Sequence, residues 1–158
     1  MNIIIRKAKE SDALSICKIL TMLGWFDDFK AIPEHILTHQ IQQHIALSYQ
    51  DNNHTLLVAE DFNHHVVGYG AVHWLPTLFL SWPEGYVSEL FVSDKERGKG
   101  IVTKLLNTIK QEAESRSCPR LVLITSKNRE SYHRRFYEKQ GWAERAGVTN
   151  FVYTLKTK

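Results

Sequence analysis

Hydrophobic and polar positions in the N-terminal part of the chain follow the period of an amphipathic helix twice. In the first segment, Ser11 is predicted to cap a helix and Gly24 to end it. The apolar positions that share one face of this helix are Ala13, Ile16, Leu20 and Leu23. A second helix, with a more mixed face, is predicted to begin after Pro33 and to extend to Leu47.

The rest of the pattern alternates between strands and helices. The segments with the strand pattern are residues 2–6, 55–59, 66–74, 86–92, 121–125 and 151–155. Polar residues 61–65 are predicted to turn the second of these strands back on the third as a hairpin. The run 121–125 is apolar throughout, which is typical of a strand buried on both faces. Two further helices are predicted at residues 100–116 and 130–140, and Gly141 is expected to end the latter.

This order of elements predicts an α/β fold, a single domain over residues 1–158 with a mixed sheet flanked by helices. The strand–helix–strand unit over residues 86–125 is predicted to be a right-handed crossover between parallel strands. Ligands of such sheets bind at the carboxyl ends of the strands, where the topology divides. A ligand site is therefore expected just after residues 86–92.

Charge and cysteine content narrow the classes of function. The formal net charge is +3 and the basic residues are dispersed, so no nucleic-acid partner is expected. Cys17 and Cys118 stand at no motif spacing, which argues against a disulfide framework or a zinc site and favours a reducing cytoplasm. No apolar segment has the length of a signal region or a membrane span, so a cytoplasmic protein without a membrane partner is expected.

A glycine-rich turn stands where the ligand site is expected. Residues 89–102 are Glu-Leu-Phe-Val-Ser-Asp-Lys-Glu-Arg-Gly-Lys-Gly-Ile-Val, a strand that leads through glycines into a helix. The first N–H groups of a helix are unpaired and carry partial positive charge, and glycine lets a phosphate approach them. Arg97 and Lys99 add positive charge, so the turn predicts a phosphate site. It is neither a Walker motif nor a dinucleotide fingerprint, and a plain turn that needs glycine is the alternative.

The turn resembles the signature of the GNAT superfamily of N-acetyltransferases, which is Arg or Gln, two residues, Gly, one residue, then Gly or Ala. Arg97 and Gly100 match it, while Val102 departs at the last small position. The resemblance implies a mostly antiparallel sheet with a splayed parallel strand pair that holds acetyl-CoA as co-substrate, without a metal. The residues that it assigns to the coenzyme are Leu90, Phe91, Val92, Arg97, Gly98, Lys99, Gly100, Ile101, Val102 and Asn128.

A second motif supports the resemblance. Residues 136–142, Phe-Tyr-Glu-Lys-Gln-Gly-Trp, are similar to the family's Phe-Tyr-Glu-Lys segment with its following Gly and aromatic residue. The family commonly carries an Asn seven residues before the tyrosine, whereas Asn128 stands nine residues before Tyr137. The resemblance further implies that the backbone of Leu90 and Val92 pairs with the pantetheine arm as an added strand would.

The implied reaction needs a stabilised oxyanion and two proton transfers. A backbone N–H near Leu90 would stabilise the oxyanion. Tyr137 matches the family's usual general acid, which protonates the departing thiolate; a packed helix tyrosine beside Phe136 is the alternative. Glu89 is the first candidate for the group that accepts the proton of the amine, and Glu84 is the second. Strand alternation places Glu89 on the face opposite Leu90.

Acidic and aromatic residues after the first helix indicate where the acceptor binds. In this family the connection after that helix walls the acceptor site, and here residues 25–29 are Trp-Phe-Asp-Asp-Phe. Asp27 and Asp28 are predicted to hold a cationic amine by charge, with cation–π contacts from the aromatics; a structural loop is the alternative. An apolar cluster consistent with either an acceptor pocket or a homodimer contact comprises Trp74, Leu78, Phe79 and Trp82. His35 and His39 are expected on a solvated helix face.

The predicted function is therefore transfer of an acetyl group from acetyl-CoA to a primary amine, by direct attack, on a small-molecule acceptor such as a small amine or polyamine. The alternatives are a peptide or protein N-acetyltransferase and a non-catalytic acyl-CoA-binding sensor on the same fold. The presence of Tyr137 favours an enzyme over a sensor.

Overall fold

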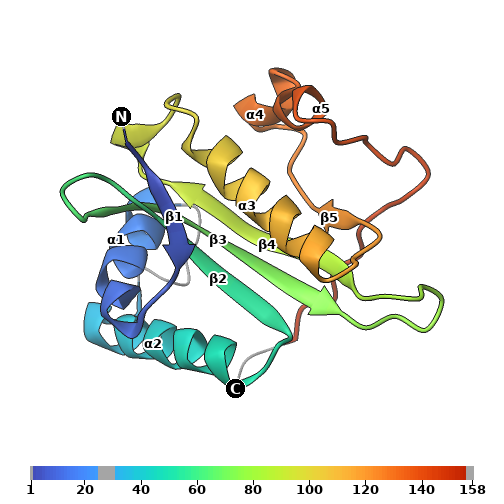
Figure 1. The fold of residues 1–158 in the computed structure, drawn as a ribbon. Coiled ribbons are helices and arrows are strands. Elements are labelled where there is room, and N and C mark those ends of the chain that lie inside the picture. The colour runs from blue at the N-terminus through green and yellow to red at the C-terminus, as the bar shows by residue number, and fades with distance from the viewer. Residues whose placement is uncertain (1, 25–30, 156–158) are drawn as a thin grey trace. The chain divides into compact units, whose positions relative to one another are not determined.

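The computed structural model describes residues 2–24 and 31–155, in which helices and strands alternate much as the pattern predicts (Figure 1). Short 3₁₀ turns precede α1 at Glu10–Asp12 and α3 at Asp94–Glu96. In chain order the elements are β1 (Ile4–Lys7), α1 (Ala13–Leu23), α2 (Glu34–Gln50), β2 (His54–Glu60), β3 (Val66–Leu75), β4 (Glu84–Val92), α3 (Ile101–Ser115), β5 (Leu121–Leu123), α4 (Glu130–His133) and α5 (Phe136–Lys139).

The strands form one sheet in the order β1-β2-β3-β4-β5. Neighbouring strands are antiparallel except β4 and β5, which are parallel and joined by the crossover through α3. The hairpin between β2 and β3 is stabilised by Asp61, whose Oδ1 accepts hydrogen bonds from the N–H groups of Asn63 and His65 at 2.9 and 2.8 Å. The predicted α/β fold with a mixed, mostly antiparallel sheet is confirmed.

Each face of the sheet is covered by helices (Figure 1). The α1 and α2 side holds a core that includes Ile16, Ile45, Val58 and Tyr69. On the α3 side, the apolar stripe Leu105, Leu106 and Ile109 is fully buried. Helix α1 ends as predicted at Gly24, which has a φ of 63°. Ser11, however, caps nothing, because α1 begins only at Ala13, after the 3₁₀ turn.

The described chain divides into two compact units, Met1–Ile124 and Thr125–Lys158. In the second unit, the prediction of one helix over residues 130–140 is wrong. This segment forms two single helical turns, α4 and α5, which are separated where Arg135 adopts a left-handed φ of 54°. Residues 151–155 form no strand, and their large side chains are exposed. In the first unit, β5 ends at Leu123 and is only half-buried, and Ile124, which was predicted to continue the buried strand, is exposed.

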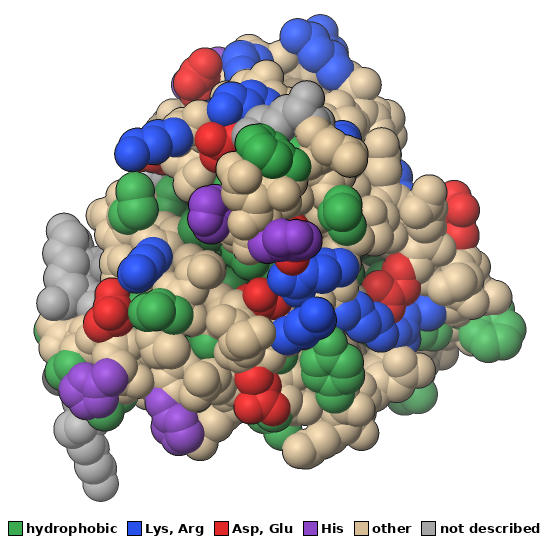
Figure 2. Space-filling model, turned by 60° about the vertical axis from the view of Figure 1, so that its left-hand side comes forward, with side chains coloured by type: hydrophobic (Ala, Val, Ile, Leu, Met, Phe, Trp, Pro, Cys, Tyr) green, Lys and Arg blue, Asp and Glu red, His purple; other side chains and the backbone are tan. Residues whose placement is uncertain are grey.

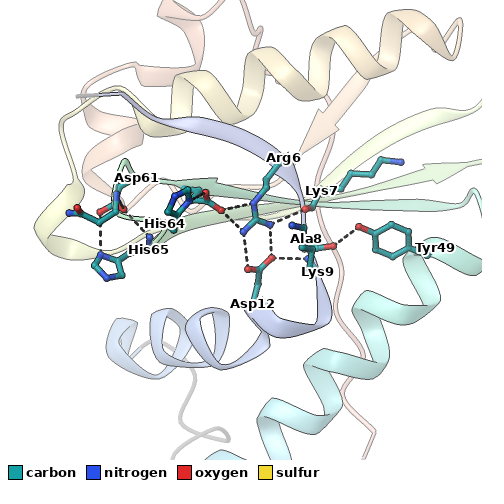
Figure 3. A network of polar contacts seen from close by, with 11 residues as sticks. Arg6, Lys7, Ala8, Lys9, Asp12, Tyr49, Asp61, His64 and His65 are labelled. Atoms are coloured by element: carbon teal, nitrogen blue, oxygen red, sulfur yellow. Dashed lines mark hydrogen bonds and ion pairs between the residues drawn. The ribbon is translucent and has the colours of Figure 1, made fainter.

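A network of charges ties β1 to the start of α1 and to the end of β2 (Figure 3). The Arg6 guanidinium donates to both oxygens of Asp12 at 2.7 and 3.0 Å, and its Nε donates to Glu60 Oε2 at 2.6 Å. His64 Nδ1 lies 2.7 Å from Glu60 Oε1. Burial opposes ionisation of Asp12, but hydrogen bonds from Arg6 and from the Lys9 N–H hold the pKa of Asp12 below its ordinary value. Contacts with His64 and Arg6 likewise lower the pKa of Glu60.

These carboxylates make the fold sensitive to acid in a way that depends on Arg6. A lowered carboxylate pKa stabilises the fold above the ordinary carboxyl range, and that stability is lost as pH falls through the folded-state pKa. Arg6→Met leaves Asp12 and Glu60 without their cation, so we expect the Tm at pH 7 to fall by roughly 5 °C. As pH falls through the lowered folded-state pKa values of the two carboxyls, the difference in Tm between the variant and the wild type should shrink.

Differential scanning calorimetry between pH 3 and pH 8 measures this effect. Lys18→Met is the matched control, because it removes the same charge from an exposed position of α1. A loss of Tm that is equal at pH 3 and pH 7 would show that Arg6 contributes through packing of its side chain and not through its charge.

Candidate functional site

The predicted phosphate turn connects β4 to α3 through two glycines in the left-handed region. Gly98 and Gly100 have φ values of 76° and 77°, and a Cβ added to either would meet no atom within 4 Å. The first hydrogen bond of α3 runs from the Lys104 N–H to the Gly100 carbonyl at 3.1 Å. The N–H groups of Ile101 and Val102 therefore have no acceptor inside the helix. The turn thus combines open space with the positive end of a helix of 15 residues.

The cations of this turn are paired with nearby acids. The Arg97 guanidinium lies 2.7 Å from Asp94, and Lys99 Nζ lies 2.8 Å from Glu96 Oε2. The charge that the sequence led us to expect is therefore partly balanced within the turn. Because both cations are about half exposed, these ion pairs are weak, and an anion at the turn would exchange them at small cost.

Beside the turn, the carboxyl-terminal half of β4 has an open edge. Strand β5 pairs with β4 only from Gly85 to Val87, and no described residue forms a strand against residues 88–92 on that side. On the other side, the Ser93 N–H donates to the Val67 carbonyl at 2.9 Å, which fixes the phase of the antiparallel ladder with β3. In this phase the polar backbone groups of Leu90 and Val92 are directed away from β3, toward the open edge.

A β-bulge interrupts β4 just where this edge opens. Ala71 of β3 pairs with Glu89 and Val72 pairs with Val87, so Ser88 is an extra residue on β4. Its Oγ is buried, and it has no hydrogen-bond partner within the described part of the chain. A bulge shifts the alternation of side chains by one position. Beyond it, Glu89 lies on the α1 and α2 face of the sheet, while Leu90 lies on the α3 face, beside Gly70 and Ile109.

The two carboxylates predicted from the sequence have different partners. Glu89 is half-buried, and its Oε2 accepts a hydrogen bond from the Tyr69 hydroxyl at 2.5 Å. Glu84, the second candidate, begins β4 and forms an ion pair with Arg120. Phe91 packs its ring against Tyr69, with 5.7 Å between the ring centroids. Glu89 is therefore the carboxylate that lies at the open part of the strand.

Tyr137 lies in the second unit, in the single turn α5. Its ring makes edge contacts with Phe136 and Trp142, with centroid distances of 5.2 and 6.3 Å. Burial raises the pKa of Tyr137 above its ordinary value, and the charge of Arg129 opposes this shift only in part. A phenol in this environment stays protonated through neutral pH, as a proton donor must.

The other residues predicted from the sequence are not placed near the glycine turn or the open edge of β4 by any contact among the described residues. Asn128 is exposed in a turn of the second unit, where its N–H donates to Ser126 Oγ at 3.2 Å. Asp27 and Asp28 lie outside the described residues. His35 and His39 are on α2, and in residues 2–24 and 31–155 no group of three or more His, Cys, Asp or Glu is placed to hold a metal ion.

The predicted apolar cluster on the loop after β3 is divided in the structure. Trp74 is buried and donates its indole N–H to Thr55 Oγ1 at 3.1 Å. The side chains that remain exposed are Leu78, Phe79 and Trp82.

Sequence reasoning missed Tyr69 and the bulge at Ser88. A signal for Tyr69 was present, because it stands between Gly68 and Gly70 in a strand, and a buried tyrosine hydroxyl needs a partner. The bulge left no such signal, because it appears only when the register of two strands is known.

Charged and apolar side chains are interleaved on the face shown in Figure 2, as the dispersed charge predicted.

Comparison with known proteins places the fold. No curated protein sequence matches the chain. One similar solved structure is ribosomal-protein-alanine N-acetyltransferase from Brucella melitensis biovar Abortus 2308, with 23% identity over 98% of this chain and 100% of that chain and a TM-score of 0.75. Glucosamine-6-phosphate N-acetyltransferase from Arabidopsis thaliana has 18% identity over 97% of this chain and 99% of that chain, with a TM-score of 0.76. An aminoglycoside acetyltransferase from an uncultured soil metagenomic sample has 21% identity over 98% of this chain and 97% of that chain, with a TM-score of 0.76. At these identities the likeness establishes the fold and leaves the acceptor undetermined.

The family is established by the sequence itself. The model of the acetyltransferase (GNAT) family matches residues 20–142, which include the glycine turn, the open edge of β4 and Tyr137. No helix among the described residues is long and apolar enough to cross a membrane. The family match agrees with the strand edge and the glycine turn that the structure brings together, and the chain belongs to the GNAT family as an acetyl-CoA-dependent N-acetyltransferase.

Proposed function

We propose that this enzyme acetylates a primary amine on a small cationic acceptor by direct attack, with Glu89 as the proton acceptor and Tyr137 as the proton donor. The observation that carries the proposal is the position of Glu89. Its carboxylate stands on β4 next to Leu90, at the point where the pairing with β5 has ended and the strand edge is open. Direct attack by the neutral amine needs a proton acceptor at this point, because the nitrogen must lose a proton as it becomes an amide nitrogen.

The residues of the first unit suit acetyl-CoA in two places. Leu90 and Val92 direct backbone groups toward an edge that an extended pantetheine arm would occupy as an added strand. Residues 97–102 offer helix N–H groups and two left-handed glycines to the pyrophosphate. The buried Oγ of Ser88 adds a polar atom beside this edge. Phe91 directs its backbone toward β3, so its contribution would be to hold the strand in place.

The proposed reaction assigns one role to each group. Bound acetyl-CoA supplies a thioester carbonyl and a thiolate leaving group. Glu89 accepts the proton that the amine loses as the new C–N bond forms. The Leu90 N–H donates to the carbonyl oxygen as negative charge develops there. Tyr137 gives its proton to the sulfur as the C–S bond breaks, so that the products are an acetamide and a neutral thiol.

The acceptor class rests on the sequence pattern. Asp27 and Asp28 are proposed to attract the cation of the acceptor, with Trp25 and Phe26 beside them. The solved structures of the same fold are named for a ribosomal protein alanine, an amino sugar phosphate and aminoglycosides, so the fold accommodates amines of several sizes. An acidic pair next to aromatics favours a small polycationic amine among them.

A thiol-release assay with acetyl-CoA against a panel of acceptors tests the proposal. The panel contains diamines and polyamines, amino sugars, aminoglycosides and short peptides with free N-termini, and mass spectrometry identifies each product. We expect the highest kcat/KM with a polyamine or a diamine, and a fall in that value as salt screens the acidic pair. If only peptides were acetylated, the proposed acceptor class of small cationic amines would be wrong and a peptide acceptor would take its place. If calorimetry showed that acetyl-CoA binds but no acceptor of the panel were acetylated, the proposed reaction would be wrong and a role as an acyl-CoA sensor would be favoured.

A further inference from the structure

Tyr69 is a buried tyrosine whose hydroxyl, among the described residues, is bonded to Glu89. The side chain is 2% exposed and belongs to the core between the sheet and helices α1 and α2. Its hydroxyl donates to Glu89 Oε2 over 2.5 Å, a short distance for this type of hydrogen bond. Glu89 Oε1 has no hydrogen-bond partner among the described residues. One oxygen of the carboxylate is thus held, and the other remains available.

The backbone around Tyr69 fixes the place of this hydroxyl. A Cβ at Gly68 would lie 2.9 Å from the Phe91 carbonyl oxygen, and a Cβ at Gly70 would lie 3.3 Å from Leu90 Cδ1. The two glycines therefore let β3 and β4 pack closely, on the face opposite the tyrosine ring. The Phe91 ring lies against that of Tyr69 on the other face. Tyr69 is consequently held between the two helices and a neighbouring ring and has little freedom to move.

The bulge at Ser88 brings the carboxylate to this hydroxyl. If β4 passed through Ser88 without a bulge, strict alternation would place Glu89 on the α3 face, together with Val87. With it, Glu89 shares a face with Tyr69 and lies across from Ala71, whose small side chain leaves room for the carboxylate. Bulges are often found where a strand must redirect a functional side chain.

We propose that Tyr69 is a positioning residue, whose hydroxyl holds Oε2 of Glu89 so that Oε1 is presented to the acceptor amine. This inference rests on the proposed role of Glu89 as proton acceptor. The hydrogen bond restricts the rotamers of a flexible side chain, so that the second carboxylate oxygen is held in one place to receive the amine proton.

The titratable neighbours agree with this arrangement. Burial, reinforced by the negative charge of Glu89, raises the pKa of Tyr69 far above its ordinary value, so the phenol remains a donor at all working pH values. His73 lies four residues after Tyr69 on the same face of β3, stacked on His54 with 5.6 Å between ring centroids. Burial and the charge of His54 lower the pKa of His73, with a smaller contribution from His44 on α2, although Glu89 opposes the shift. At neutral pH His73 is therefore uncharged and does not form an ion pair with Glu89.

A double-mutant cycle between Tyr69→Phe and Glu89→Gln tests the inference. The kcat and KM of acetyl transfer to the best amine of the panel are measured, and acetyl-CoA affinity is measured by calorimetry. We expect Tyr69→Phe to lower kcat roughly 10-fold with unchanged KM for the amine and unchanged acetyl-CoA affinity, because the carboxylate loses the donor that orients it. Glu89→Gln should cost roughly 100-fold, and adding Tyr69→Phe to it should cost nothing more.

The remaining outcomes separate the two hypotheses. Equal losses from Tyr69→Phe in both backgrounds would show that the tyrosine acts through packing alone and would overturn the inference. Wild-type turnover by Glu89→Gln would remove the proposed proton acceptor, and with it the role of Tyr69. Tyr49→Phe is the control, because the Tyr49 hydroxyl donates to the Ala8 carbonyl at 2.7 Å, away from β4, and its loss should change Tm but not kcat (Figure 3).

Discussion

Acetyl transfer by the Tyr137→Phe variant is expected to be roughly 10²–10⁴ times slower than by the wild type, the range for loss of a positioned proton donor. The substitution removes only the hydroxyl. The ring contacts with Phe136 and Trp142 are retained, so α5 should remain folded. Acetyl-CoA affinity should change little, because the proposed pyrophosphate contacts lie in residues 97–102.

The pH profile gives a second and independent signature. Because burial raises the pKa of Tyr137, the wild type should keep its donor at pH 9 and lose turnover only above about pH 10. The variant has no such group, so this alkaline limb should disappear from its already low rate. Tyr132→Phe is the matched control in the same unit, since its exposed hydroxyl donates to Glu144 Oε2 at 2.9 Å.

Single-turnover transfer is the decisive measurement, because it isolates the chemical step. A coenzyme thiolate is a fair leaving group by itself, which places the expected loss nearer the lower end of the range. If Tyr137→Phe transfers at the wild-type rate under single-turnover conditions, the tyrosine serves packing and the sulfur takes its proton from water.

Replacing Gly100 should abolish most coenzyme binding. We expect Gly100→Val to weaken acetyl-CoA affinity by roughly 100-fold or more, the equivalent of losing two backbone hydrogen bonds to a charged phosphate. The added side chain occupies the open space above the turn. Valine also strains the backbone at a φ of 77°, which β-branched residues rarely adopt.

A second variant separates crowding from strain. Asparagine tolerates the left-handed region, so Gly100→Asn should keep the wild-type Tm within a few degrees and still lose the phosphate contacts. Gly24→Asn is the matched control, because Gly24 has a φ of 63° and equally open space at the end of α1. Isothermal calorimetry with acetyl-CoA gives the affinities. Unchanged affinity in a folded Gly100→Val protein would exclude these residues as the pyrophosphate site.

The parts of the fold that could be predicted from the sequence are those with local causes. The passage from β4 through the glycine turn into α3 is visible because β-branched residues, glycines and a helical apolar stripe follow one another within one segment. The position of Glu89 opposite Leu90 followed from alternation along a single strand. The family match to residues 20–142 agrees with what these local signals indicated.

The parts that could not be predicted depend on contacts between distant segments. Residues 151–155 have the composition of a strand, but strand formation requires a partner that composition does not specify. The turn between α4 and α5 depends on Arg135, a residue type with no preference for a left-handed backbone. The hydrogen bond between Tyr69 and Glu89 joins residues 20 positions apart through the register of two strands.

The extra residue at Ser88 interrupts the two-residue period of β4 without changing how the two halves of the strand pair. Residues 84–87 and 89–92 each pair regularly with β3, and the bulge between them absorbs one position, whatever amino acid fills it. A chain that lacked this position would continue the ladder without a bulge, would pair its glutamate with the same alanine and would still present the carboxylate to Tyr69. A single-residue gap opposite Ser88 in an alignment with this chain would therefore mark a lost bulge and not a reversed strand face.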